Sequence, residues 1–374
     1  MIYLDSAATS LQKPRSVHMA VQNAMRTMAS PGRGGHRPAL LAANCAFDCR
    51  AELAELFNVR EPENVVFTMN ATHGLNIAIQ SLVKRGDRVV ISGYEHNAVT
   101  RPLHMLGADI DIAWAPVFDA ESMLETFRLK IPGAAAVVCT HVSNVFGYIL
   151  PVYEIAELCR EQGVPFIVDA SQSAGVLEVD AQRLGAQFIA MPGHKGLYGP
   201  QGTGVLICRS GARPIMAGGT GSDSRSQVMP GILPDGLEAG THNIPGIAGL
   251  MAGARYVKSR GTAQIEAHER ELTALLADAL QKVPGLEVFS AADISCQSGV
   301  LSVRHESMGA EELGEALGRA GVCVRAGLHC APTAHESAGT LSTGTVRFSF
   351  SAFNTATETM RAAAIVKSVL DREK

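Results

Sequence analysis

The feature that most constrains the fold is an alternation of short apolar runs and amphipathic stretches between residues 60 and 210. The runs have the length and composition of strands, and the stretches between them, such as 74–84 and 151–162, repeat apolar residues with helical spacing. Several runs are apolar throughout, as in strands covered on both faces. This pattern predicts an α/β fold with a mostly parallel sheet covered by helices. The expected strands are 65–68, 88–92, 110–115, 134–140, 165–169, 187–191 and 203–208.

The pattern changes after about residue 245. Long helical stretches and short strands then follow one another without the regular alternation, which predicts a smaller α+β domain. We therefore expect a large domain over 15–244, a small domain over 245–374, and an N-terminal segment, 1–14, packed near the small domain. The expected helices outside the sheet region are 15–29, 245–260, 262–283, 310–319 and 355–370, and the expected strands there are 286–289, 300–304 and 345–351.

Charge and hydropathy argue against several classes of protein. The 374 residues include 32 Lys and Arg against 36 Asp and Glu, so no basic excess favours nucleic-acid binding. No apolar run approaches the roughly 18 residues that a membrane span requires. The first residues lack a basic head and an apolar signal-peptide core. We expect a cytoplasmic enzyme with neither nucleic acid nor membrane as a partner.

The eight cysteines do not form the framework of a small disulfide-rich protein. Cys45 and Cys49 are four residues apart in a helical pattern and so share a helix face. Metal binding there would need further ligands that the local sequence lacks, so buried core thiols are expected and no metal site is predicted.

A glycine-dense loop around Lys195 is the first candidate for chemistry. The sequence 191–204 joins two predicted strands, and its glycines allow sharp bends and close approach to a ligand. A lysine in such a loop can form a Schiff base if its surroundings lower its pKa. Considered alone, the segment fits a solvated loop lysine better.

Asp169 changes that balance. It ends the buried strand 165–169, and the carboxyl ends of parallel strands face the ligand crevice of an open α/β sheet. A lysine and an acid in one crevice suit pyridoxal 5'-phosphate (PLP), which needs a Schiff-base lysine and an acid beside its pyridinium nitrogen. A strand-end cap is the alternative for Asp169.

The segment 69–74 supplies a phosphate site. It joins a predicted strand to a helix, where free backbone N–H groups and the helix dipole attract anions. Thr72 adds a hydroxyl donor. Asn70 and Thr72 are equally explained as helix caps.

Together these segments resemble the class V fold of PLP-dependent transferases, in the cysteine desulfurase and selenocysteine lyase branch. The resemblance extends from Leu4-Asp5-Ser6-Ala7-Ala8-Thr9 to the final helix. It implies fold type I, with a seven-stranded, mostly parallel sheet and a smaller α+β domain. Further matching segments are 94–98, 141–144, 238–243 and 324–331.

The resemblance also implies residue roles. Lys195 carries the cofactor and moves the substrate α-proton, His96 stacks on the pyridine ring, and Asp169 holds the ring nitrogen. Gln172 donates to the phenolic oxygen. Phosphate contacts are implied for Ala71, Thr72 and His194 and, from the other subunit of a homodimer, for Gly240 and Thr241. Substrate contacts are implied for Asn144, Arg325 and Arg347, the last of which takes the α-carboxylate. Relatives carry a phosphate-binding serine where this chain has Pro192.

Cys330 indicates which reaction of the family the enzyme catalyses. The run Arg325-Ala326-Gly327-Leu328-His329-Cys330 resembles the cysteine loop of the second desulfurase group. The resemblance implies conversion of L-cysteine, L-selenocysteine or both to alanine, with a persulfide on Cys330 or released selenium. An ordinary thiol is little ionised at neutral pH, and Arg325, His329 and the cofactor are expected to raise the thiolate fraction of Cys330.

Several alternatives remain open at this point. Cys330 could be a structural thiol. The enzyme could be a selenocysteine-specific lyase, an aminotransferase, an epimerase or a β-lyase of another small amino acid. It could also be a low-turnover PLP-binding sulfur carrier or regulatory protein. A sulfur acceptor, such as an iron–sulfur scaffold or a small acceptor protein, would be a further partner.

Overall fold

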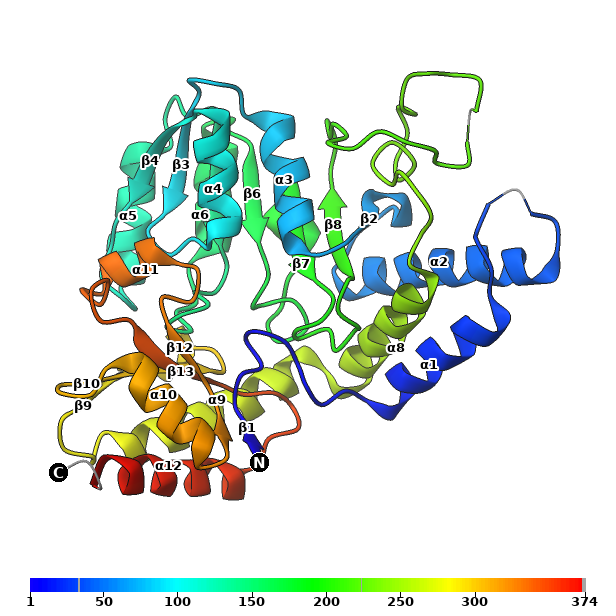
Figure 1. The fold of residues 1–374 in the computed structure, drawn as a ribbon. Helices are drawn as coiled ribbons and strands as arrows, with labels where there is room; N and C mark the ends of the chain where they lie inside the picture. Colours follow the sequence, from blue (N-terminus) through cyan, green and yellow to red (C-terminus); the bar gives the residue numbers. More distant parts are fainter. Residues whose placement is uncertain (33, 223, 372–374) are drawn as a thin grey trace.

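The computed structural model describes residues 1–32, 34–222 and 224–371. Its centre is the predicted seven-stranded sheet, with the strand order β2-β8-β7-β6-β5-β3-β4 (Figure 1). Neighbouring strands are parallel except where β8 pairs with β7 and β2. The mostly parallel α/β fold is thereby confirmed. The strands are β2 (Val65–Thr68), β3 (Arg88–Ser92), β4 (Asp109–Ala113), β5 (Ala136–Thr140), β6 (Phe166–Asp169), β7 (Phe188–Pro192) and β8 (Gly204–Cys208).

Both faces of this sheet are covered. Along β5, Ala136 and Val138 pack into one core and Val137 and Cys139 into another, because successive side chains of a strand point to opposite faces. The first core includes side chains of α3 (Ala71–Leu82) and α4 (Asn97–Leu106). The second includes side chains of three helices on the other face, α2 (Arg37–Leu56), α5 (Ala120–Lys130) and α6 (Val152–Glu161).

A second lobe holds an antiparallel sheet of order β12-β13-β10-β9. Its core also takes Ile2 and Leu4 from the start of the chain, and β1 (Ile2–Tyr3) pairs with β11 (Val322–Cys323) in parallel. The remaining elements of this lobe are β9 (Leu286–Phe289), β10 (Val300–His305), β12 (Arg325–Gly327), β13 (Thr345–Ser349), α9 (Thr262–Leu280), α10 (Ala310–Arg319) and α12 (Ala356–Asp371). Helix α11 (Pro332–Ser337) instead packs on the large lobe, where Ala334 belongs to the core of the large sheet.

Helix α8 (Ile244–Arg260) lies at the expected boundary between the large and the small domain. This helix packs against α1 (Arg15–Thr27) and α2, and Ile247 and Leu250 belong to the core of the large sheet. The packing favours a boundary near Gly261 rather than at residue 245, and the division stays a proposal. The short elements are α7 (Ala181–Leu184), η1 (Pro62–Asn64) and η2 (Ile294–Cys296).

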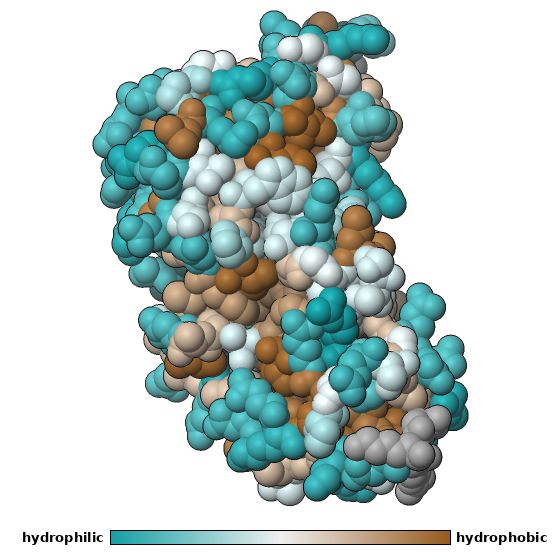
Figure 2. Space-filling model, turned by 90° about the vertical axis from the view of Figure 1, so that its left-hand side faces the viewer, coloured by the Kyte–Doolittle hydropathy of each residue, from teal (hydrophilic) through white to brown (hydrophobic). Residues whose placement is uncertain are grey.

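Figure 2 shows the side of the molecule that lies at the left of Figure 1, where polar side chains cover most of the surface and apolar patches lie on both lobes and at the waist between them. Over the described ranges, no helix is long and apolar enough to cross a membrane. Cys45 and Cys49 are buried free thiols on α2, as predicted.

Candidate active site

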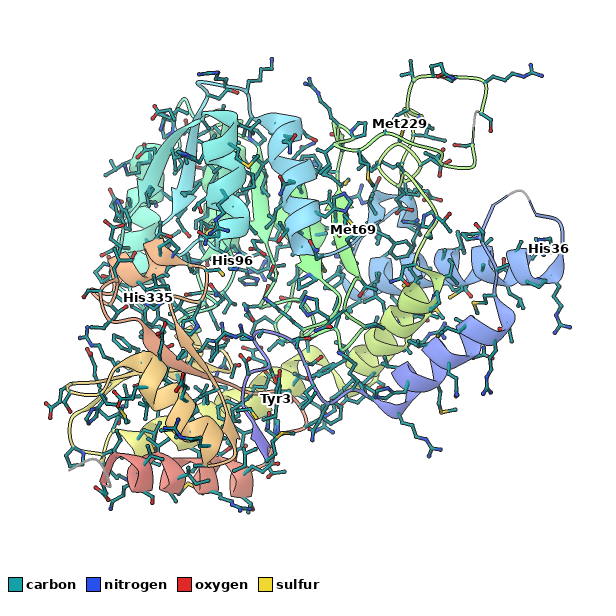
Figure 3. All side chains as sticks on the ribbon, viewed as in Figure 1. Tyr3, His36, Met69, His96, Met229 and His335 are labelled. Carbon is teal, nitrogen blue, oxygen red and sulfur yellow. The ribbon has the colours of Figure 1, made fainter. Side chains whose placement is uncertain are left out.

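The candidate residues come together because parallel strands end at one edge of the sheet. Asp169 ends β6, Lys195 follows β7, and His96 follows β3. These turns enclose a cavity of about 220 Å³. In Figure 3, His96 lies at the lower end of α4, where the sheet lobe meets the small lobe. The predicted site residues that line this cavity are Ala71, Thr72, His96, Asn144, Asp169, Gln172, His194 and Lys195.

The Lys195 loop depends on its glycines. A Cβ at Gly196 would lie 2.5 Å from the backbone oxygen of Ala174, so a larger residue would push the loop off its support. Burial, together with the Arg347 and Arg325 charges, lowers the pKa of Lys195 to about 8, although the Asp169 charge opposes this shift. A neutral amine is therefore far more populated than in an ordinary lysine.

Asp169 is only 2% exposed. Its Oδ1 accepts a hydrogen bond of 2.9 Å from the Ser171 amide, and among the described residues Oδ2 has no hydrogen-bond partner. A buried carboxylate with a spare oxygen on a cavity wall needs a cationic or N–H partner. A protonated pyridine nitrogen satisfies that need, so the residues fit the cofactor's ring.

His96 is fixed as the N-cap of α4. Its Nδ1 accepts from the Ala98 amide at 3.0 Å, which leaves the proton on Nε2. Burial lowers its pKa, so the ring is neutral. Gln172 Nε2 donates to the Ala7 carbonyl at 3.1 Å and so holds the first turn of the chain against the cavity.

The other end of the cavity has the character of an anion site. Ala71 and Thr72 form the first turn of α3, where backbone N–H groups lack intrahelical acceptors. Burial and the neighbouring Lys195 lower the pKa of His194 to about 4, so its imidazole is neutral. Pro192 lines the same cavity but has neither a backbone N–H nor a side-chain group that can donate a hydrogen bond. His194 Nδ1 shares a 3.1 Å hydrogen bond with the Thr9 hydroxyl.

Gly240 and Thr241 lie elsewhere. Both are exposed and line other cavities, beside Glu238 and His242. Glu238 is buried in a bidentate ion pair with Arg50 and also bonds to His242. In a single chain they do not reach the Lys195 cavity, and their role toward a partner's phosphate stays a prediction.

Arg347 and Arg325 share one carboxylate, that of Asp5. Arg347 is 2% exposed, and its Nη2 lies 2.9 Å from Asp5 Oδ1 while Nη1 donates to the Asn144 carbonyl. Arg325, with a side chain 51% exposed, donates to Asp5 Oδ2 at 2.9 Å. The sequence motif contained Asp5, but nothing in the motif alone indicated an ion pair to residues more than three hundred positions away.

Cys330 sits on a tight turn near the cavity. His329 and Cys330 both have left-handed backbones, with φ of 50° and 57°, and the Cys330 carbonyl accepts from the Asn97 amide at 2.7 Å. This bond ties the turn to the residue after His96. The thiol residue is exposed. Burial lowers the pKa of His329 to about 2, so its imidazole is neutral and adds no positive charge beside the thiol.

Sequence reasoning gave no role to Glu95. This carboxyl is fully buried beneath the site; its Oε1 accepts from the Thr140 amide at 2.7 Å and from Ser92, and Oε2 has no partner. Burial raises the pKa of Glu95 to about 8. Within the described part of the chain, no group of three potential metal ligands occurs.

Comparison with known proteins places these observations in a family. The family model for aminotransferase class-V proteins matches residues 2–361. A probable cysteine desulfurase of Methanothermobacter thermautotrophicus is 33% identical over 96% of this chain and 92% of its own length. One from Pyrococcus abyssi is 32% identical over 96% and 91%. The apo structure of a cysteine desulfurase from Thermococcus onnurineus NA1 superposes with a TM-score of 0.90, at 31% identity, over 99% of this chain and 95% of that one.

Proposed function

Because the chain belongs to the class V aminotransferase family, and within it to the cysteine desulfurase branch, whose cofactor is PLP, we propose that it desulfurates L-cysteine. The products are L-alanine and a persulfide on Cys330. The observation that carries the proposal is the cavity that Lys195 and Asp169 line together, with the Cys330 turn bonded to the start of α4 beside it.

The residues divide into those that would hold the cofactor and those that act on the substrate. Asp169 and His96 would hold the ring, with Gln172 beside it, and Ala71, Thr72 and His194 the phosphate. When bound, PLP supplies an electron sink for bonds at the substrate α-carbon. The half-buried Lys195 amine, with its pKa near 8, holds and moves the α-proton.

The sulfur step depends on the exposed thiol of Cys330. Its thiolate attacks the substrate sulfur, so an S–S bond forms as the substrate's C–S bond breaks. The β-carbon receives the electron pair and then a proton, which completes alanine. Arg347 and Asn144 orient the substrate through its α-carboxylate, although Asp5 already occupies one edge of the Arg347 guanidinium.

The proposal also covers the oligomeric state, the location and the sulfur acceptor of the protein. We infer a homodimer in which Gly240 and Thr241 complete the partner's phosphate site, and a cytoplasmic location. An acceptor protein would take the sulfur from Cys330, for which iron–sulfur assembly is one use. Selenocysteine is the rival substrate.

The test compares L-cysteine, cysteine sulfinate and selenocysteine as substrates, with sulfide or selenide and alanine as readouts. With an added dithiol, which is oxidised as it reduces the persulfide and releases sulfide, wild-type protein should be yellow and form alanine and sulfide in equal amounts. Cys330→Ala should keep its bound cofactor and lose at least 90% of sulfide release, since no thiolate remains to take the sulfur. Cys296→Ala, at a half-buried cysteine remote from the motif, is the matched control and should retain activity. A colourless protein, or full sulfide release by Cys330→Ala, would contradict the proposal.

A further inference from the structure

The turn that carries Cys330 has a backbone that needs support. His329 and Cys330 are consecutive non-glycine residues in the left-handed region, with φ of 50° and 57°. Residues with a Cβ rarely adopt this conformation, and it persists only where surrounding contacts hold it. The position of the nucleophile is therefore set by the contacts that fix these two residues.

Two of these contacts act on the main chain of the turn. The Asn97 amide donates to the Cys330 carbonyl at 2.7 Å, and Asn144 Nδ2 donates to the His329 carbonyl at 2.8 Å. Asn97 begins α4 and Asn144 follows β5, so both belong to the large lobe. These bonds attach the turn to the large lobe, and the His329 side chain supplies its attachment to the small lobe.

The His329 ring is bonded to strand β13 of the small lobe. The residue is 8% exposed, and its Nε2 lies 3.2 Å from both the carbonyl oxygen and the hydroxyl of Thr345. Because a carbonyl oxygen can only accept, Nε2 carries the ring proton. Thr345 is fully buried, and its hydroxyl donates to Ser302 Oγ, 3.3 Å away on the neighbouring strand β10. The ring is thereby anchored inside the small lobe.

A second histidine covers one face of the ring. His335, on α11 at the junction of the two lobes (Figure 3), is fully buried and stacks on His329 with 5.7 Å between ring centroids and 27° between ring planes. Its own Nδ1 forms a 2.7 Å hydrogen bond with the Thr340 hydroxyl. With one edge bonded and one face covered, the His329 imidazole cannot turn without breaking these contacts, and the main chain of residue 329 is fixed with it.

The same strand also holds the proposed carboxylate site. Thr345 and Arg347 are two residues apart on β13, so their side chains point to the same face and their Cα atoms lie about 7 Å apart. Arg347 Nη1 also donates at 2.9 Å to the carbonyl of Asn144, whose side-chain amide holds the turn. The anchor of the nucleophile and the group that orients the substrate thus lie side by side on one strand.

We propose that His329 is a positioning residue for the Cys330 nucleophile. Its buried ring fixes the turn on β13, so that the thiol meets the sulfur of a substrate held by Arg347. The inference rests on the proposed function, in which Cys330 takes the sulfur. The ring acts through the turn and not on the substrate itself. Its effect is therefore confined to the attack of the thiolate, whereas proton transfer by Lys195 does not depend on it.

The first measurement separates the sulfur step from the proton step. Desulfuration of L-cysteine is followed with the added dithiol, and exchange of the L-alanine α-proton is followed by NMR in deuterium oxide without it. His329→Leu removes the hydrogen bonds of the ring at similar volume, so kcat for sulfide release should fall at least tenfold with KM within threefold of wild type. Alanine exchange should stay within twofold, because alanine has no sulfur to transfer.

Two variants serve as controls. His329→Gln offers a side-chain N–H in place of Nε2 and should recover sulfide release to within threefold of wild type. His268→Leu breaks the same kind of bond, from an imidazole Nε2 of α9 to the Asn354 carbonyl at 2.9 Å, and should behave as wild type. Equal losses of sulfide release and alanine exchange in His329→Leu, no loss at all, or no recovery in His329→Gln would overturn the inference.

The second measurement needs neither cofactor nor substrate. In the apoprotein, the Asn97 amide donates to the Cys330 carbonyl, and the Ala331 amide donates within the turn itself. Loss of the ring's anchor should speed hydrogen exchange in peptides covering these two amides at least fivefold in His329→Leu, and His268→Leu should match wild type. Unchanged exchange in His329→Leu would show that the ring does not fix the turn.

A further variant decides the matter if His329→Leu does not fold. Thr345→Val keeps the carbonyl and the volume of residue 345 but removes one partner of the ring, so sulfide release should fall at least twofold with alanine exchange unchanged. Wild-type sulfide release by Thr345→Val would then overturn the inference. Wild-type protein that releases no sulfide would refute the proposed function and the positioning role with it, whereas full activity of both wild type and His329→Leu would refute the positioning role alone.

Discussion

Removing the charge of Asp5 should destabilise the junction of the two lobes. Asp5→Asn keeps the shape of the side chain but leaves Arg347 as a nearly fully buried cation without a counter-charge. Breaking a buried pair by removing one partner costs about 3–5 kcal/mol. The asparagine oxygen still accepts one hydrogen bond, worth about 1 kcal/mol, so we expect a net loss of about 2–4 kcal/mol. Arg325 adds little because its side chain is half exposed.

The assay is urea denaturation of the apoprotein. The matched control is Glu52→Gln, which removes a carboxylate that also bridges two basic residues, Arg255 and Lys258, but at the surface. The control should cost no more than about 1 kcal/mol. Combining Asp5→Asn with Arg347→Met should recover part of the loss, since the unpaired cation is gone. A coupling below about 0.5 kcal/mol, or equal losses for Asp5→Asn and the control, would refute the argument that burial makes this pair strong.

Three further predictions concern proton binding and assembly. Cofactor uptake by the apoprotein needs the neutral Lys195 amine, so stopped-flow absorbance should give a rate that rises about tenfold per pH unit below 8 and levels off above it; a rate still climbing at pH 10 would contradict this. The folded-state pKa of Glu95, about 8, exceeds its unfolded value of about 4.3, so its contribution to stability is complete below pH 4.3 and is lost as the pH rises toward 8. Denaturant titrations should show this decline flattened in Glu95→Gln, and an unchanged slope would mean that the buried acid is ionised. A mixed dimer of Lys195→Ala and Thr241→Ala chains should keep half of its sites intact if Thr241 serves the partner, and almost none if it serves its own chain.

The strands of the large sheet were predictable from the sequence because each is a short, continuous run of apolar residues. Runs such as 136–140 are apolar on both faces, so the number of strands and their places in the sequence follow from the pattern, whereas their order in the sheet does not. Helix α2 was harder: it was noticed only through the spacing of Cys45 and Cys49, since its apolar face is built largely of alanine and cysteine. The short strands β1, β11 and β12 have two or three residues each, too few for any periodicity.

The site residues likewise divide into those with a local sequence pattern, which could be predicted, and those without one, which could not. Lys195 and Asp169 were identifiable because each stands at a strand end with a local motif around it. Asp5 was given no role, because it acts through partners that only tertiary folding brings near. It meets Arg347, 342 positions away. No local pattern records such contacts.

The pairing of β1 with β11 has a consequence for the order of folding. Residues 2–5 are synthesised more than three hundred residues before their partners at 322–323 and 347–349. Joining ends so far apart in an unfolded chain costs about 5 kcal/mol of loop-closure entropy, whereas a loop of about ten residues costs about 2 kcal/mol. The cheaper route is open once both lobes have formed, because the bonds of Ser10 to the His194 carbonyl then hold the chain close to its docking place. Strand β1 is therefore expected to dock after both lobes have formed, and refolding should show a late phase that Asp5→Asn slows.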